Sequence, residues 1–207
     1  MYRLYWEACS GAILPQVMFE EMSVPYERIP VDMAAGEHQT AEYLAVNPTG
    51  QVPALELPDG TVIGESAAMA LVLGERHPEP GLVPGMEDAA RPVFLRWLLF
   101  MAASVYMTFV RVNHPERFVT DHSCVESAHQ AALDSINKQF QVLDSAISGD
   151  PWFMPAGYSA LDIYATMLAD WHPDRGHLFA HNPSLARLCL AVEGRPAYAE
   201  VIAQHRT

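Results

Sequence analysis

Hydrophobic and polar positions in the N-terminal part of the chain follow a pattern that predicts both strands and helices. Residues 1–6 alternate and are rich in aromatic side chains, which is typical of a strand. Apolar residues then recur at helical spacing over residues 14–22. Pro15 restricts this helix to a start at about Ala12 or later, because proline is tolerated only in the first helical turn. The loop of residues 7–11 is therefore expected immediately before a helix N-terminus.

The following segments complete a mixed order of strands and helices. Short strands are predicted at 25–31, 54–57 and 61–63, and helices at 41–46 and 66–76. Pro58-Asp59-Gly60 is a turn signal that joins the last two strands into a hairpin. The order β-α-β-α-β-β-α predicts an α+β domain over residues 1–77.

The second part of the chain is helical throughout. Residues 78–88 are dense in proline and glycine and are predicted as a linker. Helices are expected at about 88–113, 124–148, 160–170, 184–193 and 196–205. The longest uncharged apolar stretch, 97–110, is shorter than the roughly 20 residues that a membrane span requires, so a buried helix is expected. Residues 89–207 are therefore predicted as an all-α domain.

Composition narrows the class of partner. The net charge of −13 over 207 residues argues against nucleic acids and anionic membranes, which favour a basic surface. The three cysteines, Cys9, Cys124 and Cys189, are widely spaced and form no CxxC pair, so a reducing cytoplasm is expected. The nine histidines are scattered, and no metal site is predicted.

Two short segments carry candidate binding chemistry. Proline holds the preceding Val52 in an extended conformation, which leaves the Val52 backbone N–H and C=O available to an extended ligand. A cis bond to Pro53 is compatible with this, since it costs only about 0.5–1 kcal/mol. Glu65 or Ser66 is expected to cap the next helix, whose free N–H groups and dipole favour a carboxylate. Together the segments predict a site for a peptide-like anion.

Several motifs in chain order resemble those of a single family. Gln51-Val52-Pro53-Ala54-Leu55 resembles a cis-proline loop, and Gly64-Glu65-Ser66-Ala67-Ala68-Met69 resembles an acidic-serine pair that holds a γ-glutamyl group. Ser159 and Asp162 resemble the capping box of a buried helix, and Arg195-Pro196-Ala197 resembles the start of a last helix. Over essentially its whole length the chain is similar to the cytosolic glutathione S-transferases, of bacterial type with a serine- or cysteine-type active site.

The resemblance implies a fold and a set of ligand contacts. The fold would be a thioredoxin-like domain (βαβαββα) that binds glutathione, followed by an all-helical domain that contributes the pocket for an electrophile. The implied glutathione-binding residues are His38, Gln51, Val52, Pro53, Glu65 and Ser66. Among them, His38 and Gln51 would hold the glycine carboxylate. Tyr106 is the candidate for the hydrophobic substrate pocket. The family also implies a homodimer, with glutathione as co-substrate and no metal.

The implied reaction is addition of the glutathione thiolate to a small hydrophobic electrophile, a detoxifying transferase activity. Lowering a thiol pKa by ~2 units takes about 2.7 kcal/mol, and one hydrogen bond to a charged acceptor supplies roughly 1.5–3 kcal/mol. Ser10, ahead of the first helix, is the first candidate for this hydrogen bond, with Cys9 and Tyr5 as alternatives.

Two other functions stay open at this stage. Cys9 would instead support thiol–disulfide exchange or deglutathionylation, because its thiolate can form a mixed disulfide with glutathione. A non-catalytic binding or regulatory protein of the same fold is the third interpretation. It arises because residues 7–11 depart from the Ser-Pro-Gly pattern of bacterial members of the family.

Overall fold

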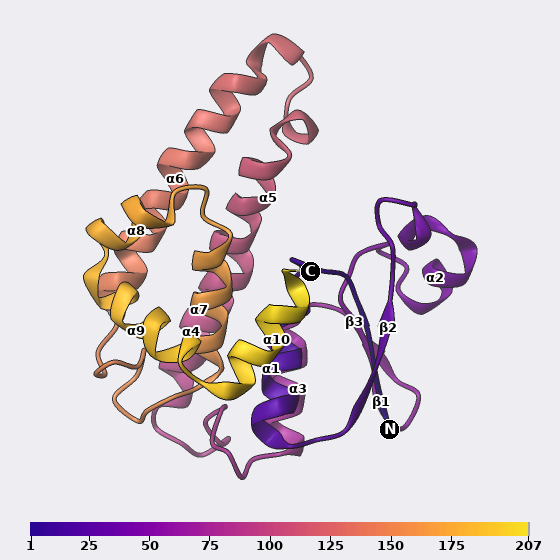
Figure 1. Cartoon of the computed structure of the whole chain (residues 1–207), viewed down its shortest axis with the longest axis vertical. Helices are drawn as coiled ribbons and strands as arrows, with labels where there is room; N and C mark the ends of the chain where they lie inside the picture. Colours follow the sequence, from indigo (N-terminus) through magenta and orange to yellow (C-terminus); the bar gives the residue numbers. More distant parts are fainter. Residues whose placement is uncertain (207) are drawn as a thin grey trace. The chain divides into compact units, whose positions relative to one another are not determined.

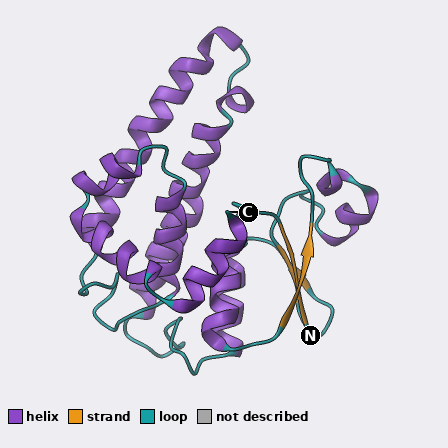
Figure 2. Ribbon diagram, viewed as in Figure 1, coloured by secondary structure: helices purple, strands orange, loops and turns teal. Residues whose placement is uncertain are grey.

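The structure is a computed structural model that describes residues 1–206 of the chain. These residues form two compact units (Figure 1). The first contains residues 1–88 and the segment from Gly194 onward, and the second contains residues 89–193. The strands of the sheet, orange in Figure 2, belong to the first unit.

A four-stranded mixed sheet organises the first unit. Its strands are β1 (Tyr2–Trp6), β2 (Tyr26–Pro30), β3 (Ala54–Glu56) and β4 (Val62–Ile63), in the order β2-β1-β3-β4. The helices of the unit are α1 (Ile13–Met22), α2 (Ala41–Val46), α3 (Ser66–Arg76) and α10 (Pro196–His205), with a 3₁₀ turn at Glu37–Gln39. β1 runs parallel to β2 and antiparallel to β3, and α1 is the crossover that the parallel pair requires. The predicted thioredoxin-like order and the β3–β4 hairpin are confirmed.

Alternation along β1 determines which face of the sheet carries the core. Tyr2 and Leu4 are 5% and 0% exposed, and the Tyr2 ring lies 5.2 Å from the ring of Phe19 in α1. α1 packs against both α3 and α10 on this side of the sheet (Figure 1). Successive side chains of a strand point to opposite faces, so Tyr5 points away from these helices. Its hydroxyl donates to Glu56 Oε2 at 3.4 Å.

The last helix packs within the first unit, whereas residues 89–207 were predicted to form one all-α domain. Arg195, just before α10, makes two hydrogen bonds of 2.7 and 2.8 Å to the Glu21 carboxylate at the end of α1. Tyr198 and Val201 of α10 are fully buried. Helical periodicity identifies α10 as a helix but does not specify its packing partner, which explains the difference.

The segment 78–88, predicted as a linker, packs onto α3. Leu82 and Val83 are 2% and 6% exposed. A Cβ atom added to Gly74 would lie 2.3 Å from Val83 Cγ2, so only glycine permits this close approach. The proline and glycine content of the segment therefore indicates irregular backbone rather than a lack of packing.

The second unit is a bundle of helices with α7 at its centre. Its elements are α4 (Arg91–Phe100), a π-helical segment (Met101–Tyr106), α5 (Met107–Asn113), 3₁₀ turns at Pro115–Phe118 and His122–Cys124, α6 (Val125–Ala146), α7 (Ala160–Asp170), α8 (Arg175–His181) and α9 (Pro183–Glu193). Ser159 and Asp162 form the predicted capping box at the start of α7. α8 was not predicted. It is a short helix whose Asp174 side chain caps it by accepting from the His177 N–H at 2.8 Å.

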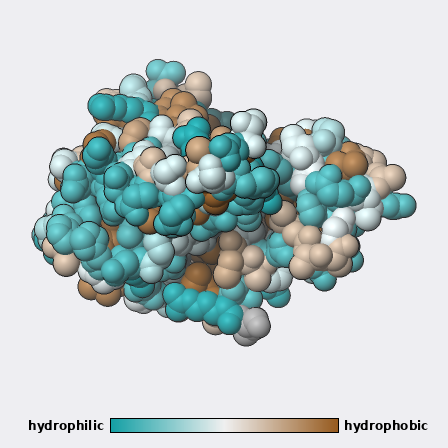
Figure 3. Space-filling view, turned by 90° about the horizontal axis from the view of Figure 1, so that it is seen from above, coloured by the Kyte–Doolittle hydropathy of each residue, from teal (hydrophilic) through white to brown (hydrophobic). Residues whose placement is uncertain are grey.

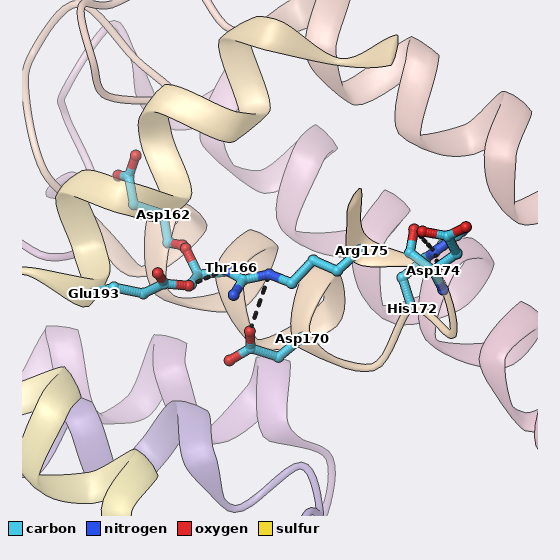
Figure 4. A network of polar contacts seen from close by, with 7 residues as sticks. All are labelled: Asp162, Thr166, Asp170, His172, Asp174, Arg175 and Glu193. Carbon is cyan, nitrogen blue, oxygen red and sulfur yellow. Dashed lines mark hydrogen bonds and ion pairs between the residues drawn. The ribbon is translucent and has the colours of Figure 1, made fainter. Parts of the chain in front are cut away.

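A polar network ties α7 to α8 and α9 in the second unit (Figure 4). The Arg175 guanidinium forms an ion pair with Asp170 at 3.4 Å and a second with Glu193. Thr166 lies deeper in the same region and donates its hydroxyl to the Asp162 carbonyl oxygen at 2.8 Å. These contacts are structural, because each links one helix of the bundle to its neighbour or to its own preceding turn.

The continuous helical run from Arg91 to Asn113 is long and apolar enough to cross a membrane, judged by length and composition alone. In its most apolar stretch of 18 residues, 39% of the residues are buried. A core helix of a soluble protein can have the same length and composition, so one such helix is weak evidence for a membrane span. Phe94 and Leu98 are fully buried, whereas Val93 and Leu99 are 50% and 55% exposed, so the helix buries one side. Figure 3 shows a face of the molecule on which polar side chains predominate among smaller apolar groups.

Candidate functional site

Two segments of the first unit meet at one end of the sheet. The strand register pairs Tyr5 with Ala54. The end of β1 therefore lies beside the Val52–Pro53 peptide bond, which is cis. The Glu7–Gly11 loop leaves β1 at this same end. The loop with the candidate catalytic groups and the segment with the candidate backbone contact to glutathione are thus neighbours.

The N-terminus of α3 joins these segments. Ser66 is 7% exposed, and its hydroxyl donates to the Gly11 carbonyl oxygen at 2.9 Å. Glu65 occupies the N-cap position with a φ of 62° and makes no side-chain cap bond. The expectation that one of these side chains caps the helix is therefore wrong. The amide groups of the first turn have no helical partner and stay available to an anion.

Val52 presents unpaired backbone groups to the site. Its N–H and C=O make no hydrogen bond to any other part of residues 1–206. The carbonyl of the preceding Gln51 is fixed, because it accepts from the Tyr43 hydroxyl at 2.6 Å and from Asn47 Nδ2 at 2.7 Å. The side chain of Gln51 is exposed. Tyr43 of α2 and Asn47, which follows α2, thus fix the backbone immediately before Val52.

His38 lies close to this backbone. A Cβ atom on Gly50 would be 3.2 Å from the His38 carbonyl oxygen, and Gln39 Nε2 donates to the Gly50 carbonyl oxygen at 3.4 Å. The His38 side chain is half-buried. Its Nδ1 atom is buried without a hydrogen-bond partner in the described part of the chain. A ligand group could therefore satisfy this nitrogen.

The Glu7–Gly11 loop fixes the oxygen of Ser10. Ser10 Oγ donates to the Glu7 carbonyl oxygen at 2.7 Å and accepts from the Ala12 N–H at 3.3 Å. Cys9 is more exposed and has a left-handed φ of 54°. Its Sγ lies 3.1 Å from the carbonyl oxygen of His205. The two loop candidates are adjacent but differ in environment.

Tyr5 stands near the end of β1, two residues ahead of the Glu7–Gly11 loop. The Tyr5 side chain lies on the sheet face opposite α1, and burial raises its pKa although the neighbouring Arg3 acts in the opposite direction. Tyr106 belongs to the second unit, where its ring packs 5.1 Å from Trp171. Within residues 1–206, no three side chains of the metal-binding types converge on one point.

Sequence reasoning missed His205, which contacts the loop directly. The Cys9 N–H donates to His205 Nδ1 at 3.0 Å. His205 is 2% exposed at the end of α10. A signal was present, since His205 follows Tyr198 and Val201 at helical spacing on the buried face of α10. A titratable residue on an apolar face indicates a specific partner, but it does not say which one.

The four-stranded sheet, its helices and the helical second unit define the class of thioredoxin-like proteins with an all-helical C-terminal domain. The model of the family "Glutathione S-transferase, N-terminal domain" matches residues 12–76. The chain is 26% identical over 203 residues to the uncharacterized GST-like protein YncG of Escherichia coli strain K12, covering 98% of this chain and 97% of that protein. It is 22% identical over 170 residues to glutathione S-transferase GstA of Escherichia coli O157:H7, covering 82% and 81%.

A solved structure gives the same fold. The glutathione transferase homolog from Sulfitobacter, with bound glutathione, matches with a TM-score of 0.90 at 24% identity, covering 99% of this chain and 98% of that one. The chain is therefore similar to glutathione S-transferases over most of its length, and the match to the family model is confined to residues 12–76. The family match begins at residue 12, so it includes the segments around Val52 and Ser66 but not the Glu7–Gly11 loop.

Proposed function

We propose that this protein is a glutathione transferase that binds glutathione at the end of the sheet and adds its thiolate to a small hydrophobic electrophile. The hydrogen bond from Ser66 to Gly11 carries the proposal, because it joins an anion-binding helix N-terminus to the candidate thiol-activating loop. The match of residues 12–76 to the N-terminal domain of the glutathione S-transferases supports it. The Sulfitobacter homolog with bound glutathione supports the same choice of ligand.

In this proposal each part of glutathione meets a separate set of donors. The γ-glutamyl carboxylate binds the amide groups of the first turn of α3 and the Ser66 hydroxyl, whose single proton turns to it from the Gly11 carbonyl oxygen, with Glu65 beside the amino group. The cysteinyl unit pairs with the free backbone groups of Val52. His38 and Gln51 hold the glycine carboxylate. Such short-range donors offset the unfavourable net charge of −13, because charges more distant than about 10 Å are largely screened by salt.

The thiolate is stabilised by Ser10. The Ala12 N–H holds the Ser10 oxygen in place, so the hydroxyl proton can turn from the Glu7 carbonyl towards a ligand sulfur without moving the oxygen. A donor fixed in advance in this way stabilises developing charge with little reorganisation. Holding the thiolate and the electrophile together then supplies much of the rate.

The exposure of Cys9 favours a second candidate function, a glutathione-dependent thiol–disulfide or deglutathionylation activity. The Cys9 thiolate would attack the disulfide between glutathione and a protein thiol and release that protein thiol. The resulting mixed disulfide would be cleaved by a second glutathione, giving oxidised glutathione and free Cys9. Both functions use the same glutathione site and differ in the atom that performs the chemistry.

The proposal also includes features that the family implies. Residues 1–77 bind glutathione, residues 78–88 connect the two parts of the chain, and the helices of the second unit contribute the electrophile pocket, with Tyr106 in its lining. The protein acts in the cytoplasm as a homodimer and uses glutathione as co-substrate without a metal.

A calorimetric titration with glutathione tests the binding site. Replacing Ser66 with alanine removes a hydrogen bond to a charged group, worth roughly 1.5–3 kcal/mol. The affinity for glutathione is therefore expected to fall by about 10- to 100-fold. Ser159→Ala is the matched control, because Ser159 is also a buried serine beside a helix N-terminus but lies in the second unit. Equal affinities of the Ser66→Ala protein and the unmodified protein would contradict the proposed site.

A further inference from the structure

We infer that His205 is a positioning residue for the Glu7–Gly11 loop, holding the Cys9 backbone so that the Ser10 oxygen is fixed ahead of α1. The inference rests on the proposed function for its catalytic consequence, but the contact itself does not depend on it. His205 accepts two hydrogen bonds from one residue of the loop. The Cys9 N–H donates to Nδ1 at 3.0 Å, and Cys9 Sγ donates to the His205 carbonyl oxygen at 3.1 Å.

The contacts of His205 define its tautomer. Because Nδ1 accepts from the Cys9 N–H, the ring proton lies on Nε2, which donates to Gln16 Oε1. Gln16 lies in α1 and is fully buried. Burial lowers the pKa of His205 to about 4, and the positive charge of Arg28 acts in the same direction. The imidazole is therefore neutral at physiological pH, as an acceptor at Nδ1 requires.

Packing fixes the ring as firmly as its hydrogen bonds do. His205 is 2% exposed, and its ring meets the Trp6 ring edge-on at 5.0 Å. The Arg28 guanidinium lies 5.5 Å from the centroid of the Trp6 ring and donates a hydrogen bond to Gln204 of α10. The end of β1, the start of α1 and the end of α10 thus meet around one imidazole.

The loop needs such an anchor because Cys9 is strained. A left-handed conformation costs a non-glycine residue roughly 1–2 kcal/mol, and such residues persist where their surroundings fix them. Cys9 has a φ of 54° and is followed directly by Ser10, whose oxygen bonds both Glu7 and Ala12. Releasing the Cys9 N–H would let this turn relax and would move the Ser10 oxygen.

The same contact separates the roles of the loop residues. The Cys9 N–H is committed to His205 and is unavailable to a ligand thiolate. Stabilisation of the thiolate then falls to the Ser10 hydroxyl, which the anchored turn presents. A residue 196 positions away along the chain therefore controls the geometry of the candidate catalytic group.

Steady-state kinetics of three variants test the inference. His205→Phe keeps a ring but has no acceptor, so kcat is expected to fall by between about 10- and 100-fold, as a displacement near 1 Å can cause. The KM for glutathione is expected to stay close to its original value. His205→Asn retains an oxygen near the position of Nδ1 and should recover most of kcat. Glu21→Gln weakens the ion pair with Arg195 at the opposite end of α10 and should leave kcat unchanged.

A second readout separates this inference from the proposed function. The rate at which iodoacetamide alkylates Cys9, followed by mass spectrometry of its peptide, requires neither glutathione binding nor turnover. His205→Phe is expected to raise this rate by about fivefold, because a hydrogen bond worth about 1 kcal/mol that holds the loop is lost. An unchanged alkylation rate in a folded His205→Phe protein would overturn the inference. Equal losses of kcat in His205→Asn, His205→Phe and Glu21→Gln would also overturn it, since they would indicate general destabilisation.

Discussion

Replacing Ser10 with alanine is expected to lower kcat for conjugation by about 10- to 100-fold, with glutathione affinity largely retained. The physical reason is the loss of one hydrogen bond to a thiolate, worth roughly 1.5–3 kcal/mol, where 1.4 kcal/mol corresponds to about tenfold. The thiolate of bound glutathione would then form at higher pH. The rising limb of the pH–rate profile should therefore shift to higher pH in Ser10→Ala, and steady-state kinetics across pH would measure it.

Cys9→Ala is the matched control for this experiment. Cys9 is adjacent to Ser10, and its exposed thiol is the group that the second candidate function would use. The Cys9→Ala protein is expected to retain conjugating activity. Full activity in Ser10→Ala together with loss of activity in Cys9→Ala would contradict the Ser10 assignment and move the chemistry to the cysteine.

Replacing Asp162 with alanine is expected to reduce the free energy of unfolding by about 3–5 kcal/mol. The Asp162 carboxylate accepts from the Phe153 N–H at 2.7 Å, from the Ser159 N–H at 2.8 Å and from Ser159 Oγ at 3.0 Å. Its removal leaves two buried N–H groups without partners, at a cost of about 1–3 kcal/mol each. Burial raises the pKa of Asp162 to about 6, so desolvation of the carboxylate offsets part of what these bonds contribute.

Urea unfolding followed by circular dichroism would measure this loss. Ser159→Ala removes the capping hydroxyl but keeps both backbone bonds to Asp162, so its expected cost is only about 1 kcal/mol. Equal destabilisation by the two substitutions would contradict a dominant role for the carboxylate. Both substitutions lie in the second unit and the candidate glutathione-binding segments in the first, so glutathione affinity should be unchanged in the folded proteins.

Local signals in the sequence were sufficient for most of the fold. α3 spans Ser66–Arg76, as its pattern predicted. The Ser159–Asp162 capping box is present, because both partners lie within one turn and the spacing alone specifies their geometry. Pro15 placed the start of α1 correctly, since the restriction that proline imposes is also local.

Features that depend on distant contacts could not be predicted. The sequence contains no signal that α10 packs against α1, because an apolar helix face can serve any partner. The left-handed backbone of Glu65 was also missed, since its neighbours rather than its residue type impose it. The bond from Ser66 to Gly11 and the anchoring of Cys9 by His205 join residues far apart in the chain. The candidate binding segments were therefore visible in the sequence, whereas the construction of the loop required coordinates.

A crystal structure with bound glutathione tests the central claim most directly. The account predicts an extended ligand with its cysteinyl backbone paired to Val52 and its γ-glutamyl carboxylate at Ser66. It also predicts that the ligand sulfur lies within about 3.5 Å of Ser10 Oγ. A sulfur atom bonded to Cys9 Sγ would contradict the conjugating mechanism and favour disulfide exchange. Glutathione bound elsewhere, or no binding at saturating concentration, would contradict the site itself.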